Sequence, residues 1–214
     1  MSRPIPDLRT ERELVDGGAT FVAGMDEVGR GAIAGPVMVG VVVIDRNIVL
    51  RGDIPSGLAD SKLLSEKRRV ALVEPVREWC VSWSVGVAEA SEIDAHGIMT
   101  ALQLAGQRAL SQLTVQPDVV IVDGPIDWLT ENPARGAAGD PRVVTQVKAD
   151  QLCASVAAAS IVSKVQRDQL MVALHEHFPA YGWASNKGYG SALHRGAIKE
   201  MGACDFHRRT WNLS

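Results

Sequence analysis

Residues 21–44 read FVAGMDEVGRGAIAGPVMVGVVVI, and this stretch decides the fold. Its first apolar residues predict a short strand over 21–25 that ends at Asp26-Glu27. Residues 36–44 are rich in β-branched side chains and follow glycine and proline, so they predict a second strand. A glycine-rich turn at 29–31 separates the two runs. We therefore expect a hairpin with two carboxylates beside its turn.

The turn itself contains Gly29-Arg30-Gly31-Ala32-Ile33-Ala34, which matches the pattern G-x-G-x-x-[G/A] of dinucleotide-binding sites. Such a site requires a helix to begin at the turn, because the helix N-terminus holds the pyrophosphate. Here Gly35-Pro36 leads into a β-branched run instead, which excludes that interpretation. What remains is a turn that can offer backbone N–H groups to a phosphate or a sugar. An ordinary hairpin turn would explain the glycines but neither Arg30 nor the adjacent acidic pair.

The rest of the chain continues as alternating helices and strands. We expect helices over residues 7–16, from Ser65 until Pro75 kinks or ends the helix, over 91–113, and from about Asp150 to His177. Further strands are predicted over 80–88, 118–123 and 143–147, with a loop over 130–142. This order predicts an α/β fold whose mixed sheet is antiparallel in its first half and parallel in its second.

Composition sets limits on the function. The chain has 214 residues, 46% hydrophobic and 22% charged, as is ordinary for a globular protein. No run approaches the roughly 20 apolar residues that a bilayer requires, and no secretory signal is recognised, so we expect a cytoplasmic protein without membrane contact. Cys80, Cys153 and Cys204 are odd in number, are far apart and include no pair at C-x-x-C spacing, so they indicate neither a disulfide framework nor a zinc site. The formal net charge of −3 argues against binding nucleic acid by phosphate neutralisation alone, unless an acidic metal site accounts for it.

Two carboxylates stand at predicted strand ends. Asp26 and Asp123 each follow an apolar strand, at the edge where reactive groups converge in open α/β sheets. Turns also accept such residues, which would explain either one alone. Glu27 reaches the same site only if its strand has ended or bent, because adjacent side chains of a strand point to opposite faces. Asp150, at a predicted helix N-terminus, joins the candidates, although it would serve equally well as a cap.

Two other aspartates compete with Asp150. Asp168 lies on the same face of the predicted helix, but at about 1.5 Å per residue it is roughly 27 Å further along. Paired metal ions lie only about 3.5–4 Å apart, so Asp168 is too distant to share them. Asp140 lies in a Gly-Asp-Pro turn of the 130–142 loop, which is poorly suited to holding a ligand in place. We therefore favour Asp150.

Six motifs follow one another along the chain. They are Gly24-Met25-Asp26-Glu27-Val28-Gly29-Arg30-Gly31 with Ala34-Gly35-Pro36-Val37, Asp60-Ser61-Lys62-Leu63-Leu64-Ser65, Val122-Asp123-Gly124, Lys148-Ala149-Asp150, Ala158-Ala159-Ser160-Ile161-Val162-Ser163-Lys164-Val165-Gln166-Arg167-Asp168, and Lys187-Gly188-Tyr189-Gly190-Ser191 with His194. In this order they closely resemble the ribonuclease HII family, over about residues 21–211. The sequence departs from the family at Ala149 and Ser191, which replace Gly and Thr, and in a longer interval between Asp123 and Asp150.

The resemblance implies a ribonuclease H-like fold with a five-stranded sheet and a small helical C-terminal part. We expect one catalytic domain over residues 1–214, in which residues from about 178 to 214 contact the substrate. The resemblance assigns four carboxylates both to catalysis and to the binding of two divalent ions, Mg²⁺ or Mn²⁺. These residues are Asp26, Glu27, Asp123 and Asp150.

The implied enzyme is an endonuclease that hydrolyses the RNA strand of RNA/DNA hybrids and cuts duplex DNA at single embedded ribonucleotides, leaving 5′-phosphate and 3′-hydroxyl ends. Its expected roles are ribonucleotide removal from DNA and RNA primer removal, and we expect it to act as a monomer. By the same resemblance Gly29, Arg30, Gly31 and Tyr189 sense the 2′-hydroxyl, the group that distinguishes RNA from DNA.

Lys62 is the expected phosphate contact, and Lys187 is a weaker candidate. Tyr189 could instead be a packing residue at a turn. Two other classes of function stay open: another metal-dependent nuclease of the same fold, such as a resolvase or integrase, and a non-catalytic nucleic-acid-binding module.

Overall fold

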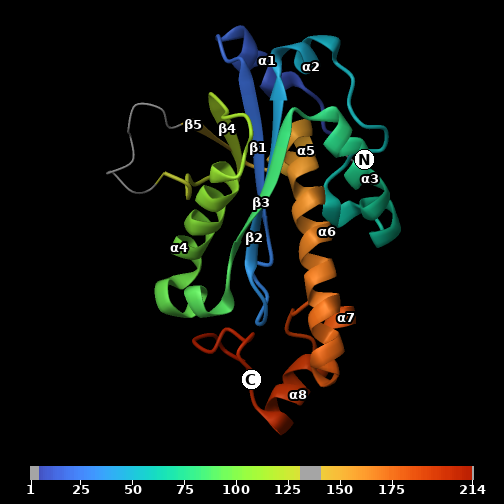
Figure 1. Cartoon of the computed structure of the whole chain (residues 1–214), viewed down its shortest axis with the longest axis vertical. Coiled ribbons are helices and arrows are strands. Elements are labelled where there is room, and N and C mark those ends of the chain that lie inside the picture. The colour runs from blue at the N-terminus through green and yellow to red at the C-terminus, as the bar shows by residue number, and fades with distance from the viewer. Residues whose placement is uncertain (1–4, 131–140, 214) are drawn as a thin grey trace.

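The computed structural model describes residues 5–130 and 141–213. A five-stranded mixed sheet runs through the molecule in the order β3-β2-β1-β4-β5 (Figure 1). The central pair β1–β2 and the pair β2–β3 are antiparallel, whereas β1–β4 and β4–β5 are parallel. This confirms the predicted mixed sheet. The strands are β1 Phe21–Val28, β2 Val37–Asp45, β3 Ser82–Ala88, β4 Val119–Asp123 and β5 Arg142–Gln146.

Helices cover both faces of the sheet, with α4 on one side and α6 and α3 on the other (Figure 1). Beyond the far end of α6, the short C-terminal helices gather below the sheet (Figure 1). No helix of the described residues is long and apolar enough to cross a membrane. The helical elements are α1 Arg9–Asp16, α2 Arg46–Arg51, η1 Ser61–Leu63, α3 Glu66–Trp79, α4 Ala90–Ser111, α5 Ala149–Leu152, α6 Ala154–His177, η2 Pro179–Tyr181, α7 Trp183–Asn186 and α8 Ala192–Met201.

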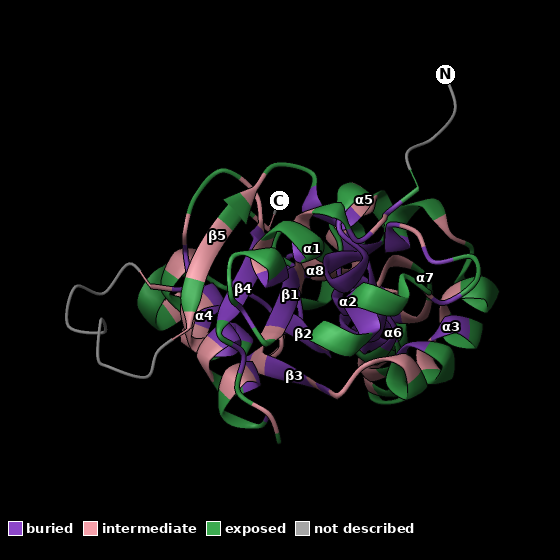
Figure 2. Ribbon diagram, turned by 90° about the horizontal axis from the view of Figure 1, so that it is seen from above, coloured by how far each residue is buried: buried purple, intermediate pink, exposed green. Residues whose placement is uncertain are grey.

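Two hydrophobic cores lie on opposite faces of the sheet, because successive strand residues point to opposite sides. On β1, Val22 belongs to the core under α6, whereas Ala23 and Met25 belong to the core under α4. The central strands are consequently buried on both faces, while β5 at the edge is more exposed (Figure 2). Gly24 lets α6 approach β1 closely, since a Cβ atom there would lie 2.2 Å from the backbone carbon of Ser155.

Strand β1 is longer than the sequence predicts. It was expected to end at Met25, but it runs through Asp26 and Glu27 to Val28. The antiparallel ladder with β2 explains the difference, because Glu27 pairs with Val39 and Val28 with Met38. On its other side β1 pairs with β4 only as far as Met25. The last residues of β1 therefore extend past the paired part of β4.

The long helix predicted from Asp150 is interrupted. The single-turn helix α5 ends at Leu152, Cys153 is extended with φ −101° and ψ 125°, and α6 then begins. Asp7 pairs with Cys153 across this break, accepting from the N–H of Ala154 at 2.9 Å through its carbonyl. Glu11 completes the junction, because its Oε1 accepts from the N–H and the Oγ of Ser155 at 2.9 and 2.7 Å. The N-terminal segment thus fixes where α6 begins.

Two other helix predictions need correction. Pro75 was expected to kink or end its helix, and the ending is excluded, because α3 continues through Pro75 to Trp79. Helix α4 contains Gly97 in a non-helical conformation, with φ 79° and ψ 163°, so its two parts meet at a kink. Glycine adopts a positive φ without steric penalty, which permits that kink. Most of the predicted 130–142 loop, with Asp140, lies outside the described residues.

Candidate active site

Four carboxylates, here called the acidic cluster, are brought together at one end of β1 and β4. In the parallel register Met25 is paired with Val122, so Asp26 and Asp123 follow at neighbouring strand ends. Asp150 comes from α5, which follows β5. Both Asp26 and Asp150 are only 3% exposed. The members of the cluster are Asp26, Glu27, Asp123 and Asp150.

Burial and mutual repulsion shape the acidic cluster. Burial, and then the negative charges of Glu27, Asp123 and Asp150, raise the pKa of Asp26 well above its ordinary value. Burial and the charge of Asp150 raise the pKa of Asp123, although its Oδ1 accepts from the N–H of Ala149 at 2.7 Å. Removing carboxylates from water and placing them together disfavours their charged forms. A bound cation would therefore stabilise the charged forms of these carboxylates.

Glu27 interacts electrostatically with other members of the acidic cluster. Burial and then the charge of Asp123 raise its pKa, while the nearby guanidinium of Arg30, 3.6 Å from its Oε1, lowers it. Glu27 and Asp26 alternate along a continuous strand, so the predicted end of the strand is not what brings them together. Their position beyond the paired part of β4 leaves both near Asp123.

Lys62 supplies a positive charge to the acidic cluster. Its Nζ donates to Oδ2 of Asp150 at 3.0 Å. Burial alone would lower the pKa of Lys62, but the hydrogen bond to Asp150 and the charge of Asp26 raise it above its ordinary value. The turn that carries Lys62 is fixed, because Asp60 Oδ1 accepts from the N–H of Lys62 at 2.9 Å and Ser61 N–H donates to Ser160 Oγ at 3.3 Å.

The donor chemistry of the acidic cluster fits a hard divalent cation. Carboxylate oxygens are the ligands that Mg²⁺ and Mn²⁺ prefer. Within residues 5–130 and 141–213, no three His, Cys, Asp or Glu side chains are already arranged around one point as metal ligands. Mg²⁺ is commonly held by only one or two carboxylates and keeps several waters, so a ready-made group of three is not required.

Replacing Asp26 by asparagine should stabilise the protein when no cation is bound. The pKa of Asp26 is raised from 3.8 by folding, so this group contributes stability below its unfolded-state pKa and loses it as pH rises through the folded-state pKa. Near neutral pH its charge is unfavourable. Asp26→Asn should therefore raise the thermal midpoint in EDTA by about 2–4 °C, the shift for about 1 kcal/mol in a chain of this size.

Scanning calorimetry in EDTA measures this shift, and the advantage of the variant should shrink as the pH is lowered. A midpoint for Asp26→Asn below that of the unmodified chain, at neutral pH without cations, would contradict the electrostatic account.

A cleft of about 360 Å³ connects part of the acidic cluster to the glycine turn. It brings Lys62 and Tyr189, which are distant in sequence, next to Asp26, Glu27 and residues 29–31. Three polar lining residues were not singled out from the sequence, although they lie inside the D-S-K and A-A-S-I-V-S-K motifs. These residues are Ser61, Ser160 and Lys164.

Tyr189 lies on the cleft with 38% of its surface exposed. Its ring lies 5.9 Å from Lys164 Nζ and 5.5 Å from the guanidinium carbon of Arg167. Its backbone is fixed, because its N–H donates to Asn186 O at 2.9 Å and its carbonyl lies 2.9 Å from Nδ1 of the buried His194. A tyrosine that is partly exposed on a fixed backbone is available to stack its ring against a ligand.

Lys187 is less favourably placed. It is not among the residues that line the cleft, and its ammonium donates to the carbonyl of Ala184. Its backbone adopts a positive φ of 49°, which directs the chain into Gly188 and Tyr189. Lys187 as a substrate contact therefore stays a prediction.

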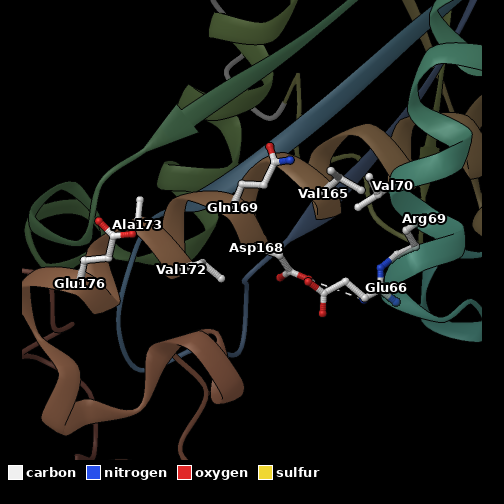
Figure 3. A pocket seen from close by; sticks show the side chains of 9 residues that line it. All are labelled: Glu66, Arg69, Val70, Val165, Asp168, Gln169, Val172, Ala173 and Glu176. Atoms are coloured by element: carbon white, nitrogen blue, oxygen red, sulfur yellow. Dashed lines mark ion pairs between the residues drawn. The ribbon is translucent and has the colours of Figure 1, made fainter.

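Asp168 lies in a different environment, a groove between α3 and α6 of about 300 Å³ (Figure 3). It is buried and paired with Lys164 at 2.7 Å and with Arg69 at 3.7 Å. Figure 3 shows its carboxylate directed across the groove to Arg69 on α3. No member of the acidic cluster lines this groove. Asp168 is thus paired with Arg69, which lines the groove, and with Lys164, which lines the cleft.

The fold and this arrangement of carboxylates define a class of protein. Ribonuclease H2 from Pyrococcus horikoshii superposes with a TM-score of 0.73 at 30% identity, covering 90% of this chain and 94% of that one. RNase HII from Archaeoglobus fulgidus, solved in a complex with PCNA, gives 0.71 at 30% identity over 91% and 96%. A Bst-RNase HIII, solved with Mn²⁺, shares the fold at 0.67 and 21% identity over 92% and 68%. The molecule is a ribonuclease H-like nuclease.

Sequence comparison identifies the family. Residues 23–214 match the sequence profile of Ribonuclease HII. Ribonuclease HII of Streptomyces avermitilis is 47% identical over 195 residues, which cover 91% of this chain and 78% of that protein. The enzyme of Paracoccus denitrificans is 43% identical, covering 96% and 91%. The chain belongs to the ribonuclease HII family and is an endonuclease with ribonuclease H activity.

Proposed function

We propose that this ribonuclease H cuts duplex DNA at single embedded ribonucleotides as well as the RNA strand of RNA/DNA hybrids. The observation that carries the proposal is the cleft that joins Asp26 and Glu27 to the glycine turn and Tyr189. A strand lying in it would have a phosphate near carboxylates and a sugar near an aromatic ring and exposed backbone. Discrimination of RNA from DNA requires contact with the 2′-hydroxyl, for which these groups are suited.

The acidic cluster is the proposed site of two divalent ions, Mg²⁺ or Mn²⁺. Its support is the set of buried oxygen donors whose mutual repulsion is relieved by positive charge. The ions, when bound, activate a water and neutralise charge on the phosphate and the leaving oxygen. Attack of the water on phosphorus with breakage of the P–O3′ bond would leave 5′-phosphate and 3′-hydroxyl ends. The proposed ligands are Asp26, Glu27, Asp123 and Asp150.

The remaining cleft residues bind and orient the strand in this proposal. Lys62, which carries one charge near the acidic cluster and is two-thirds exposed at its side chain, attracts the backbone phosphate. Residues 29–31 offer N–H groups to the sugar and phosphate, and Tyr189 packs its ring on the sugar. The segment of about residues 178–214 contributes Tyr189, which supports its role in contacting substrate. We further propose that the protein acts as a monomer in the cytoplasm and takes part in ribonucleotide removal from DNA and in RNA primer removal.

Tyr189→Ala tests whether Tyr189 recognises the sugar of a single ribonucleotide. At one embedded ribonucleotide every contact must fall on one nucleotide, so kcat/KM should drop about 10- to 100-fold, as expected for loss of an aromatic stacking contact. A long RNA/DNA hybrid offers many registers, so its cleavage should suffer less. Steady-state kinetics on both substrates measure the difference, with Tyr189→Phe as the control that keeps the ring.

Equal loss on the two substrates would point to general positioning or folding. No loss on either substrate would make Tyr189 a packing residue.

Two other functions make distinct predictions in the same assay. A resolvase or integrase of this fold would cut branched or all-DNA substrates, and a binding module would cut nothing. Duplexes that differ only in one ribonucleotide, with an all-DNA duplex and a four-way junction as controls, separate the three. Cleavage confined to the ribonucleotide supports the proposal, and cleavage of the all-DNA duplex at an equal rate rejects it.

A further inference from the structure

Two arginines, Arg167 and Arg208, are fully buried next to the glycine turn. None of the ion pairs formed by the described residues includes either of them. A buried cation without a carboxylate is costly unless it is hydrogen-bonded. Burial, and then the charge of Arg167, lower the pKa of Arg208 to about 9. The burial of two arginines without carboxylate partners therefore has to be explained by their hydrogen bonds.

Arg208 directs its donors at the carbonyls of the glycine turn. Its Nη2 donates to Gly29 O at 2.6 Å and its Nη1 to Arg30 O at 2.9 Å. Its Nε and Nη2 both donate to Gly35 O, at 3.2 and 3.1 Å. The guanidinium also lies over the ring of Trp211, 4.8 Å from its centroid. A planar fork of five donors fits such a set of carbonyls, whereas a lysine would supply the charge without this geometry.

Arg167 holds the other end of the same segment. It donates to Ala34 O at 3.1 Å, to Pro36 O at 2.9 Å and to Lys187 O at 2.9 Å. Gly29 has a φ of 83°, and a Cβ atom there would lie 2.1 Å from Arg167 Nε. The turn is therefore packed directly on both guanidinium groups.

The hydrogen bonds from Arg208 to the carbonyls of the turn are related to the direction in which the N–H groups of the turn point. Every peptide bond of the described residues is trans, so the N–H of each peptide points opposite to its carbonyl. The carbonyls of Gly29 and Arg30 face Arg208, so the N–H groups of Arg30 and Gly31 point away from it. Both residues are exposed and line the cleft. Among the described residues, no backbone hydrogen bond uses either N–H group.

We propose that Arg208 is a positioning residue that clamps the glycine turn, so that the N–H groups of Arg30 and Gly31 face the sugar and phosphate of the bound strand. A hydrogen bond accepted by a carbonyl polarises the peptide and makes the N–H of that peptide a stronger donor. The hydrogen bonds from Arg208 would therefore also strengthen the hydrogen bonds from Arg30 and Gly31 to the substrate. The inference rests on the proposed role of residues 29–31 in binding the substrate. It adds a specific residue, on the last segment of the chain, to that role.

The experiment compares Arg208→Gln and Arg208→Lys with the unmodified chain on a duplex holding one ribonucleotide. Contacts made equally in the ground state and the transition state set KM, whereas the acidic cluster sets kcat. Arg208→Gln should therefore raise KM about tenfold with kcat changed little, and with the same Mg²⁺ dependence. Arg208→Lys, which keeps the charge without the fork, should raise KM by a smaller factor.

Val15→Ala is the matched control. Val15 lies on α1 and is buried, so its truncation should destabilise the fold, as the Arg208 substitutions should. All variants are assayed below their unfolding transitions, and Arg208→Lys serves if Arg208→Gln fails to fold. An increase in KM in the Arg208 variants but not in Val15→Ala supports the clamp. An unchanged KM in folded Arg208→Lys, or a loss confined to kcat, overturns it. If the unmodified chain fails to cut at the ribonucleotide, the proposed function fails instead.

Discussion

Asp123→Asn is expected to reduce cleavage by about a thousandfold or more while leaving the fold intact, because several kcal/mol of charge stabilisation depend on the metal site. Asp123 ends β4 beside Asp26, and its Oδ1 already accepts from the N–H of Ala149. Asparagine can still accept that hydrogen bond but is a much weaker ligand for a hard cation. The backbone around the acidic cluster should therefore persist while the reaction does not.

Single-turnover cleavage and thermal unfolding, measured on the same preparations, test this prediction. Asp118→Asn is the control, because Asp118 directly precedes β4 and its side chain accepts from the backbone N–H groups of Thr20 and Phe21, at 2.7 and 2.9 Å. EDTA should abolish activity in the unmodified chain, and added Mg²⁺ should restore it. Substantial cleavage by a folded Asp123→Asn protein would remove the two-metal proposal.

Asp150→Asn is expected to inactivate the enzyme by about a hundredfold or more, whereas Asp168→Asn should retain activity within a few fold. The two aspartates are both buried and both paired with a lysine, so burial and charge alone do not distinguish them. Only Asp150 acts on the pKa of Asp26 and Asp123. Asp168 lies in the groove between α3 and α6, and an asparagine in its place could still accept hydrogen bonds from Lys164 and Arg69.

Cleavage rates under single-turnover conditions, compared at matched fractions of folded protein, decide the second prediction. Asp168→Asn should lower the thermal midpoint, because it weakens two buried ion pairs. If both variants lost activity equally when fully folded, Asp168 would belong to the reaction, and the separation of the groove from the cleft would be wrong.

The sheet could be predicted because its signals are local. The β-branched run of β2, the apolar β4 and the glycine turn between β1 and β2 each indicate their own conformation without reference to distant residues. The order of these elements then leaves few topologies for a mixed sheet. The same reasoning placed Asp26 and Asp123 at one edge, since neighbouring parallel strands end there.

Features that depend on distant contacts could not be predicted. Nothing near Cys153 announces a break, since neither proline nor glycine occurs there, and the interruption arises from pairing with Asp7. The extension of β1 through Glu27 depends on its register with β2. Arg208 lies in the C-terminal tail, and no local pattern in the sequence indicates its hydrogen bonds to the carbonyls of Gly29 and Arg30.

The junction at Cys153 has a consequence for the order in which the molecule is assembled. Asp150 is carried by a four-residue helix, too short to be stable alone, so its position depends on the pairing of Cys153 with Asp7. Contacts between residues so distant in sequence form late, because closing a long loop costs entropy before the contact is gained. The fourth carboxylate should therefore reach its place only after the N-terminal segment has docked, which makes catalytic competence a late event of folding.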